Sequence, residues 1–320
     1  MTDQPAPARP PEWAAEHAVG AAEAAELVGR QFPDLRGAPV TPLATGWDNT
    51  VHLMDGRWIF RFPRREMAVP GVRREIAVLP RLARRLPLPI PVPELIGTPS
   101  DTYPWPFFGA RMVPGRELAE AGLADPDRER AGVGVGGLLR ALHEPSLVAE
   151  VDAPLPVDPM RRGDPGVRAA KARERLDALG RRGLWQPSRA LDDLLSRADR
   201  LGRSTAGVGA PDGRLVVVHG DLHSRHLLVG GDGRATGVID WGDACLADPS
   251  VDLSLAYGGF AGRARAALLA AYGPVDPEAE VAARVLAVFL CAALADYAAD
   301  EDRRVLLGES LAGLRRAVSD

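Results

Sequence analysis

The stretch VVVHGDLHSRHLLV, residues 216–229, decides how the rest of the chain is interpreted. It holds three of the six histidines and one aspartate, and it begins with an apolar run. A short apolar run of this kind is typical of a buried strand, so the polar residues after it are expected in a loop. This loop could be a metal cage, a catalytic loop or a coincidence, and the surrounding sequence has to decide.

A second aspartate, Asp240, follows Asp221 at a distance that leaves room for a hairpin between them. The runs RLVVV, HLLVG and ATGVID predict three short strands, and the Gly-rich turn GDG joins the last two as a hairpin. Asp221 follows the first strand, and Asp240 ends the hairpin. Phosphoryl transfer needs one carboxylate to orient or deprotonate the acceptor and another to hold Mg²⁺. Two strand-end loops brought together by a hairpin could supply both.

The N-terminal part of the chain predicts an antiparallel sheet with two helices. A helix is expected at 21–35, stopping near Pro33, and a second one within 70–86. Asp55-Gly56 predicts a hairpin turn between two alternating runs. The Pro-rich segment 87–97 predicts an extended connection. The expected strands are VTPLA (40–44), TVHLMDG (50–56), RWIFRFPRR (57–65) and FFGARMVPG (107–115).

Beyond Pro114-Gly115 the chain is mostly helical by its periodicity, apart from the strands around Asp221. Helices are expected at 129–144, 166–180 and 190–201, and two more between Pro277 and Asp320. The predicted division is an N-terminal lobe, 1–113, with a disordered start at 1–12, and a C-terminal lobe, 114–320.

These motifs resemble the aminoglycoside phosphotransferase and choline kinase-like family over about residues 38–260. The family's catalytic loop reads HGDxxxxN and its metal motif reads IDW or IDF followed by DPxxD, and this chain has HGDLHSRH and VIDWGDACLADPSVD. The resemblance implies an α+β, protein-kinase-like bilobal fold, with a small antiparallel β-sheet N-lobe and a larger, mainly helical C-lobe.

The resemblance assigns roles to four residues of the C-terminal lobe. Asp221 is the catalytic aspartate, Asp240 holds the metal, and Asp252 braces the catalytic loop. His226 stands where the family usually has an asparagine metal ligand, as it does in the aminoglycoside 2''-phosphotransferases and macrolide phosphotransferases. Mg²⁺ prefers oxygen ligands, and imidazole suits softer divalent metals, so Mn²⁺ is the alternative to Mg²⁺.

The resemblance places nucleotide binding in the N-terminal lobe. Arg61 replaces the usual phosphate-binding lysine, Glu75 is its expected partner, and the backbone of Met112 and Val113 would meet the purine base. The loop that covers the nucleotide comprises Gly46, Trp47, Asp48 and Asn49. Without the resemblance, that loop would be a plain hairpin turn, Arg61 an exposed strand residue and Glu75 a solvated helix residue.

The composition of the chain narrows its possible partners, its location and the side chains that could bind phosphate. The chain has 320 residues, a net charge of -4 and a pI of about 5.9, so no basic footprint for nucleic acid is present. No uninterrupted apolar window of spanning length is found, which predicts no membrane partner and a cytoplasmic location. Lys171 is the only lysine, so any phosphate-neutralising side chain must be an arginine. High Ala, Gly, Pro and Arg content indicates a bacterial, high-G+C genome.

The predicted function is transfer of the γ-phosphate of ATP or GTP to a hydroxyl of a small molecule. An aminoglycoside is the expected acceptor, because the cluster within residues 296–302 could form an acidic wall for a polycation. A macrolide phosphotransferase or a sugar or amino-alcohol kinase is the alternative, and a catalytically silent nucleotide-binding protein is the alternative of another class. A metal hydrolase would leave VIDW unexplained. The protein is expected to be a monomer or weak dimer.

Overall fold

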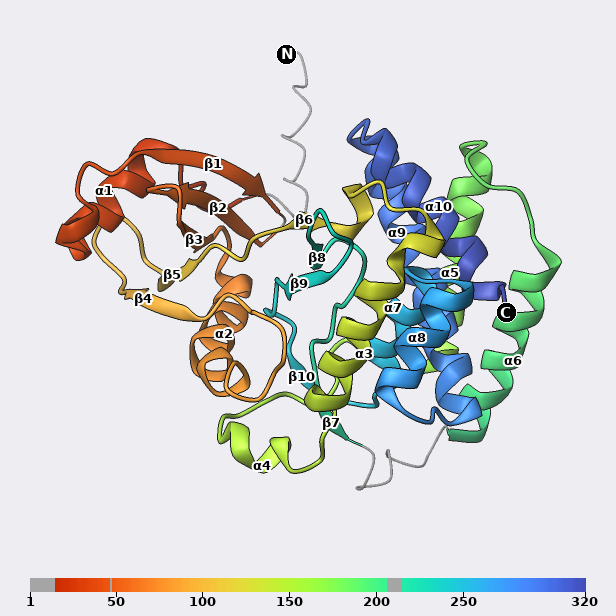
Figure 1. Ribbon diagram of the computed structural model, residues 1–320. Coiled ribbons are helices and arrows are strands. Elements are labelled where there is room, and N and C mark those ends of the chain that lie inside the picture. The colour runs from red at the N-terminus through yellow and green to blue at the C-terminus, as the bar shows by residue number, and fades with distance from the viewer. Residues whose placement is uncertain (1–14, 47, 206–214) are drawn as a thin grey trace, which may run out of the picture. The chain divides into compact units, whose positions relative to one another are not determined.

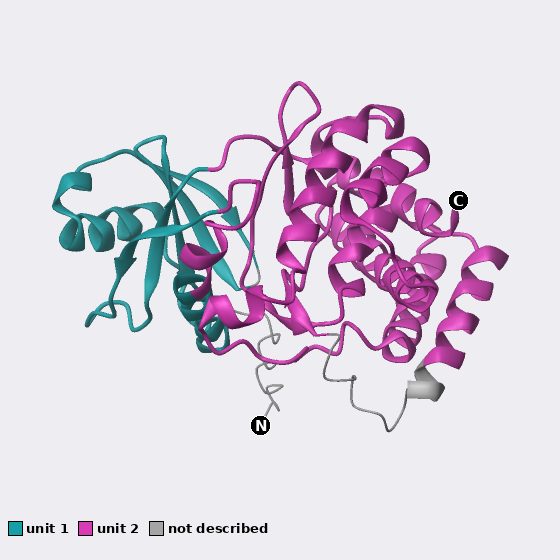
Figure 2. Cartoon of the chain, turned by 60° about the horizontal axis from the view of Figure 1, so that its bottom comes forward, with its two compact units in different colours: residues 1–77, 91–112 teal, residues 78–90, 113–320 magenta. Residues whose placement is uncertain are grey.

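The computed structural model describes residues 15–46, 48–205 and 215–320. Trp47 and the predicted disorder of residues 1–12 lie outside the described residues. The chain divides into two compact units (Figure 2): unit 1 is residues 1–77 with 91–112, and unit 2 is residues 78–90 with 113–320. The predicted lobes differ from these units chiefly at residues 78–90, which group with the helical unit.

Unit 1 is built on one five-stranded antiparallel sheet with the order β1-β2-β3-β5-β4 (Figure 1). Its strands are β1 (Val40–Thr45), β2 (Asn49–Met54), β3 (Trp58–Pro63), β4 (Pro93–Gly97) and β5 (Phe107–Arg111). Asp55 and Gly56 both have positive φ, 53° and 63°, so the predicted hairpin turn is confirmed. β4 lies in the segment for which only an extended connection was predicted.

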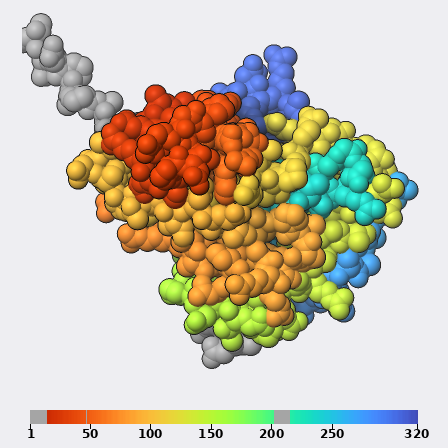
Figure 3. Space-filling model, turned by 60° about the vertical axis from the view of Figure 1, so that its left-hand side comes forward, coloured from red at the N-terminus to blue at the C-terminus, as the bar shows by residue number. Residues whose placement is uncertain are grey.

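Two helices flank the sheet of unit 1. They are α1 (Ala21–Gln31) and α2 (Val69–Leu82), and α2 continues into unit 2. Neighbouring residues of a strand point to opposite faces. Phe107 therefore joins the core that contains Leu27 of α1, whereas Phe108 packs with Val72 of α2. On the face seen in Figure 3, α1 and the first strand (red) lie beside the β4 segment (amber).

Unit 2 is mainly helical, in agreement with the predicted α+β class. Its further helices are α3 (Glu129–Leu142), α4 (Leu147–Val151), α5 (Pro165–Arg181), α6 (Arg189–Thr205), α7 (Ser250–Gly258), α8 (Gly262–Tyr272), α9 (Pro277–Asp300) and α10 (Arg304–Val318). The Asp164 side chain caps α5 by accepting the Val167 N–H at 3.0 Å. Lys171, the only lysine, is exposed on α5.

Two small sheets carry the motif segments of unit 2. The predicted hairpin is confirmed as β8 (Leu227–Val229) and β9 (Ala235–Val238), with β6 (Arg116–Glu117) beside β8. The first predicted strand, β7 (Val216–Val218), does not join this hairpin. It pairs instead with β10 (Cys245–Ala247), which was not predicted.

Within the described residues, α9 is long and apolar enough to cross a membrane by length and composition, and 61% of its most apolar window is buried. Leu286 and Leu290 of α9 pack with Val216 and Val218 of β7 in one core. Core helices of globular domains pass the same test, so the apolar length of α9 matches its place at the centre of unit 2.

Glycines bring two helices of unit 2 into close contact. A Cβ atom on Gly132 would lie 2.5 Å from the carbonyl oxygen of Ala264, and one on Gly136 would lie 2.2 Å from that of Leu268. Both distances are shorter than any real contact of this kind. The glycines of α3 therefore let its backbone approach that of α8 more closely than any larger residue allows.

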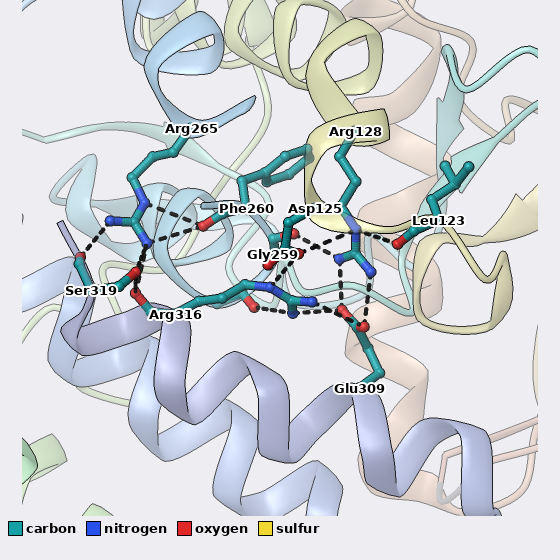
Figure 4. A network of polar contacts seen from close by, with 10 residues as sticks. Leu123, Asp125, Arg128, Gly259, Phe260, Arg265, Glu309, Arg316 and Ser319 are labelled. Carbon is teal, nitrogen blue, oxygen red and sulfur yellow. Dashed lines mark hydrogen bonds and ion pairs between the residues drawn. The ribbon is translucent and has the colours of Figure 1, made fainter. Parts of the chain in front are cut away.

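Arginines fix the C-terminal helix to the start of α3 (Figure 4). Arg128 donates two hydrogen bonds to the carboxylate of Glu309, at 2.7 and 2.8 Å, and Arg316 donates to the same carboxylate at 2.8 Å. Arg316 also contacts Asp125 at 2.8 Å, and Arg265 donates to the Arg316 carbonyl at 2.6 Å. The arginine side chains of this network bury their charge only because carboxylates and carbonyls surround them.

Candidate active site

The loop after β7 is held by one buried carboxylate. Asp252 of α7 is completely buried, and its two oxygens accept the backbone N–H groups of His219 at 2.7 Å and of Gly220 at 3.0 Å. Burial alone would raise the pKa of Asp252, but the hydrogen bond and charge of His143, with the His219 N–H, lower it. The predicted brace is confirmed, and it keeps its negative charge.

His143 orients that carboxylate. Its Nε2 lies 3.3 Å from Oδ2 of Asp252, and its Nδ1 lies 3.1 Å from the hydroxyl oxygen of Tyr272. His143 immediately follows α3. Its partner is far away in the sequence, so no local pattern could indicate the contact.

His219 ties the loop after β7 to the second motif. Its Nδ1 accepts the N–H of Asp221 at 3.2 Å, and its Nε2 donates to the carbonyl of Ile239 at 3.0 Å. Burial lowers the pKa of His219, so the ring is neutral, with the proton on Nε2. Trp241 packs against the ring with a centroid distance of 4.6 Å.

His226 and Asp240, the predicted metal ligands, lie together. His226 Nδ1 is 2.8 Å from the carbonyl oxygen of Asp221, which can only accept, so His226 donates its Nδ1–H there. Its Nε2 lies 3.5 Å from Oδ2 of Asp240. A histidine that donates one ring N–H to a carbonyl while its other nitrogen faces a carboxylate fits the usual pattern of a metal ligand.

Asp240 has an unusual backbone. Its φ is +67°, in the left-handed region that only glycine, asparagine and aspartate visit readily. Such conformations cost free energy and persist where the surroundings hold them, often at functional sites. Here the conformation directs the partly exposed Asp240 carboxylate towards His226. The donor set of one imidazole and carboxylates suits Mg²⁺ or Mn²⁺.

The carboxylate of Asp221 is flanked by two side chains. Its Oδ1 lies 3.1 Å from a guanidinium nitrogen of Arg162, and its Oδ2 lies 3.7 Å from Nε2 of His223. Burial, together with the charges of His226 and Arg225, keeps the pKa of His223 well below its usual value. Asp221, His223 and His226 have ligand atoms that all lie within 4.8 Å of one another.

Unit 1 contains the predicted pair of Arg61 and Glu75. The guanidinium Nη1 of Arg61 lies 3.2 Å from Oε1 of Glu75, and the two side chains are 10% and 0% exposed. The pairing is therefore confirmed. The readings of an exposed arginine and a solvated glutamate are excluded, because a buried arginine needs a carboxylate partner of this kind. Phosphate binding by Arg61 stays a prediction.

The other predicted nucleotide contacts, apart from Trp47, lie in two separate segments of the chain. Gly46 and Asp48 lie between β1 and β2, and Asn49 begins β2. The Gly46 N–H donates to the Asn49 carbonyl at 2.9 Å, and the Asp48 side chain pairs with Arg65. Met112 ends unit 1, and its N–H donates to the Arg57 carbonyl at 2.8 Å. This donor is thus already used. Val113 begins the second part of unit 2.

Comparisons with known proteins agree with this geometry. A sequence model described as the phosphotransferase enzyme family matches residues 39–284. A local match links the chain to the uncharacterized protein YcbJ of Bacillus subtilis (strain 168), with 49% identity over 39 residues, but it covers only 12% of this chain and 13% of that protein.

Solved structures share the fold. The GDP complex of wild-type aminoglycoside 2'-phosphotransferase-IIIa has a TM-score of 0.67 at 23% identity, covering 93% of this chain and 98% of that one. Macrolide 2'-phosphotransferase type I has a TM-score of 0.57 at 26% identity, with 93% and 98% covered. The predicted protein-kinase-like fold is confirmed. Since the family model spans most of the chain and both of its motifs, the chain belongs to the phosphotransferase enzyme family.

Proposed function

We propose that this protein transfers the γ-phosphate of ATP or GTP to a hydroxyl group of a small molecule. The observation that carries the proposal is the meeting of Asp221, His226 and Asp240 on one braced loop and its neighbouring turn. Phosphoryl transfer is catalysed mainly by positioning and by charge neutralisation, and this set of side chains supports both. Neighbouring structures hold GDP, or ATP with streptomycin, which supports a nucleoside triphosphate as the donor.

Each side chain has a defined task in this proposal. Asp221 orients the acceptor's hydroxyl and takes its proton as the phosphoryl group departs from the nucleotide. His226 Nε2 and Asp240 hold Mg²⁺ or Mn²⁺, which supplies neutralisation of the phosphate charge. The brace of Asp252 keeps the backbone of the catalytic loop in place. Arg61 binds a nucleotide phosphate, and Glu75 holds Arg61.

The acceptor class rests on the family likeness. The expected acidic wall is already engaged: Asp296 pairs with Arg175 at 3.1 Å and with Arg182 at 2.6 Å, and Asp300 pairs with Arg182 at 2.9 Å. An aminoglycoside would have to compete with these arginines. Among neighbouring structures are a GDP and kanamycin complex of APH(2") and macrolide phosphotransferases. We propose aminoglycosides as the first acceptors and macrolides as the second.

The test is nucleoside diphosphate release with Mg²⁺, measured separately with ATP and GTP against kanamycin, gentamicin and erythromycin. We expect release that depends on one acceptor, and we expect Asp221→Asn to lower kcat by several orders of magnitude while the protein stays folded. Asp232→Asn is the matched control, because Asp232 is an exposed aspartate in the β8–β9 turn. Equal rates for wild type and Asp221→Asn would overturn the proposal. A cytoplasmic location and a monomeric or weakly dimeric state remain predictions.

A further inference from the structure

Arg162 contacts the predicted catalytic carboxylate from outside both sequence motifs. One of its guanidinium nitrogens lies 3.1 Å from Oδ1 of Asp221 and 2.9 Å from Oδ2 of Asp243. Its side chain is 13% exposed, whereas those of Asp221 and Asp243 are 24% and 46% exposed. The guanidinium is therefore held between two carboxylates at the edge of the accessible site.

The loop that carries Arg162 is rigidly built. Both oxygens of Asp158 accept backbone N–H groups, from Arg162 at 2.7 Å and from Gly163 at 2.8 Å. Asp158 and Arg161 have positive φ, 28° and 52°. Non-glycine residues adopt this conformation at a cost, so two of them in one short loop indicate that its shape is maintained for a purpose.

The same loop is attached to the strands that position Asp221. Its residue Asp158 donates its N–H to the carbonyl of Leu246 at 2.9 Å, and the Leu246 N–H donates to Pro156 at 2.9 Å. Leu246 belongs to β10, which pairs with β7, and β7 leads directly into the catalytic loop. Arg162 and Asp221 thus share one small sheet as their common support.

Asp243 is fixed to this assembly through its backbone. Gly220 has a φ of +89°, and a Cβ atom there would lie 2.3 Å from the Asp243 carbonyl oxygen. The turn after Asp240 therefore packs directly on the catalytic loop, and Asp243 provides a fixed second partner for the guanidinium. One nitrogen of the planar guanidinium meets both carboxylates, so the fixed orientation of this rigid group sets their separation more firmly than a flexible ammonium can.

We propose that Arg162 is a positioning residue for phosphoryl transfer. It holds Oδ1 of Asp221 so that the other oxygen, Oδ2, meets the acceptor's hydroxyl, and Asp243 anchors Arg162 in that position. The inference rests on the proposed function, because it assigns Arg162 to the same carboxylate. A misplaced catalytic group costs about 10²-fold in rate, so this is the expected scale of the effect.

The experiment measures kcat and KM for Arg162→Ala with MgATP and MgGTP. The acceptor is the one that the nucleoside diphosphate assay identifies, or water, through basal nucleotide hydrolysis. We expect kcat to fall about 10²-fold with little change in the nucleotide KM. The kcat of Arg162→Lys should lie between those of the wild type and Arg162→Ala, because lysine keeps the charge but lacks the rigid, planar guanidinium. Guanidinium ions at millimolar concentration should partly restore Arg162→Ala.

The control is Arg161→Ala. Arg161 is the neighbouring arginine, but its side chain is 68% exposed and pairs with Asp164. It should keep the wild-type kcat. Thermal unfolding of every variant checks that the fold is intact, and Arg162→Lys takes the place of Arg162→Ala if the latter does not fold.

A double-mutant cycle separates positioning from a general structural effect. In the Asp221→Asn background, Arg162→Ala should cause no further loss, since the carboxylate through which it acts is gone. An equal loss in both backgrounds would overturn the inference. So would a wild-type kcat for both Arg162 variants while Asp221→Asn is inactive, and this outcome would leave the proposed function standing. A fully active Asp221→Asn would instead remove the proposed function, and the inference with it.

Discussion

At the scale of single residues, the site depends on which hydrogen-bonding partner each side chain meets. Asp252 receives only donors: two backbone N–H groups of the loop after β7 and the ring of His143. His219 divides its two nitrogens between an N–H and a carbonyl. Each partner leaves one protonation state as the only one that fits. The geometry around Asp221 is therefore set by the negative charge of Asp252 and by the neutral ring of His219.

Replacing Asp252 by asparagine tests this dependence. The amide of Asp252→Asn would place an N–H group against a backbone N–H donor, so we expect a loss of about 1–3 kcal/mol of unfolding free energy at pH 7. The folded-state pKa of Asp252 lies below its ordinary value of 3.8. Its contribution is therefore present above that value and is lost as the pH falls through the folded pKa.

The measurement is urea unfolding of both proteins, followed by tryptophan fluorescence, between pH 7 and pH 3. The difference in unfolding free energy should be constant down to about pH 4 and should shrink below it. A difference that does not change with pH would show that the Asp252 charge is irrelevant. Asp248→Asn serves as control, because among the described residues the Asp248 side chain accepts one hydrogen bond, from the N–H of Ser250 near the start of α7.

At the scale of elements, two adjacent glycines of α3 predict effects of opposite sign. Gly136→Ala would drive a methyl group into the Leu268 carbonyl of α8, so we expect a loss of about 1–3 kcal/mol of unfolding free energy. Gly137 has nothing within 4 Å of an added Cβ, so Gly137→Ala should stabilise by about 0.5–1 kcal/mol through helix propensity. Chemical denaturation measures both, and the same sign for both would contradict the packing.

Local signals explain which elements the sequence predicted. The turn residues Asp55-Gly56 predicted the β2–β3 hairpin, and long runs with helical periodicity predicted α9 and α10. Helix α7 was missed because nearly all of its side chains are buried, so it has no polar face to reveal a period. β10 has three residues, and only its pairing with β7 makes it a strand.

The residues of the candidate site likewise divide into those that local sequence signals predicted and those that only the structure shows. Asp221, His226 and Asp240 were predicted because they lie in two short motifs, and the structure brings them together. Arg162 and His143 reach the site from segments far away along the chain. Their contacts are products of tertiary packing, and no spacing rule within one segment contains them. The sequence could therefore indicate the chemistry but not the residues that hold it in position.

At the scale of the whole molecule, the network of Figure 4 holds the last helix of the chain in place. Glu309 is the carboxylate shared by Arg128 and Arg316, whose side chains are 3% and 8% exposed. Glu309→Gln would leave these buried cations without it, so we expect a loss of about 3–5 kcal/mol of unfolding free energy. Urea denaturation, without guanidinium salts, measures this loss of unfolding free energy.

Glu26→Gln is the matched control for that prediction. Glu26 also pairs with an arginine, Arg30, but the two side chains are 59% and 58% exposed. Exposed pairs contribute about 0–1 kcal/mol, so the control should hardly change the stability. A comparable loss in the two variants would show that the burial of the C-terminal network is not what matters.

The rarity of lysine has a practical consequence. Lys171 is exposed on α5, and no other side chain of the protein carries a primary amine. Amine-directed reagents can therefore modify a single side chain. It lies on a helix whose N-terminus is capped by Asp164. A fluorophore or a surface linker coupled there would occupy one defined position. All molecules tethered through Lys171 would then be attached by the same face of α5, without any engineered cysteine.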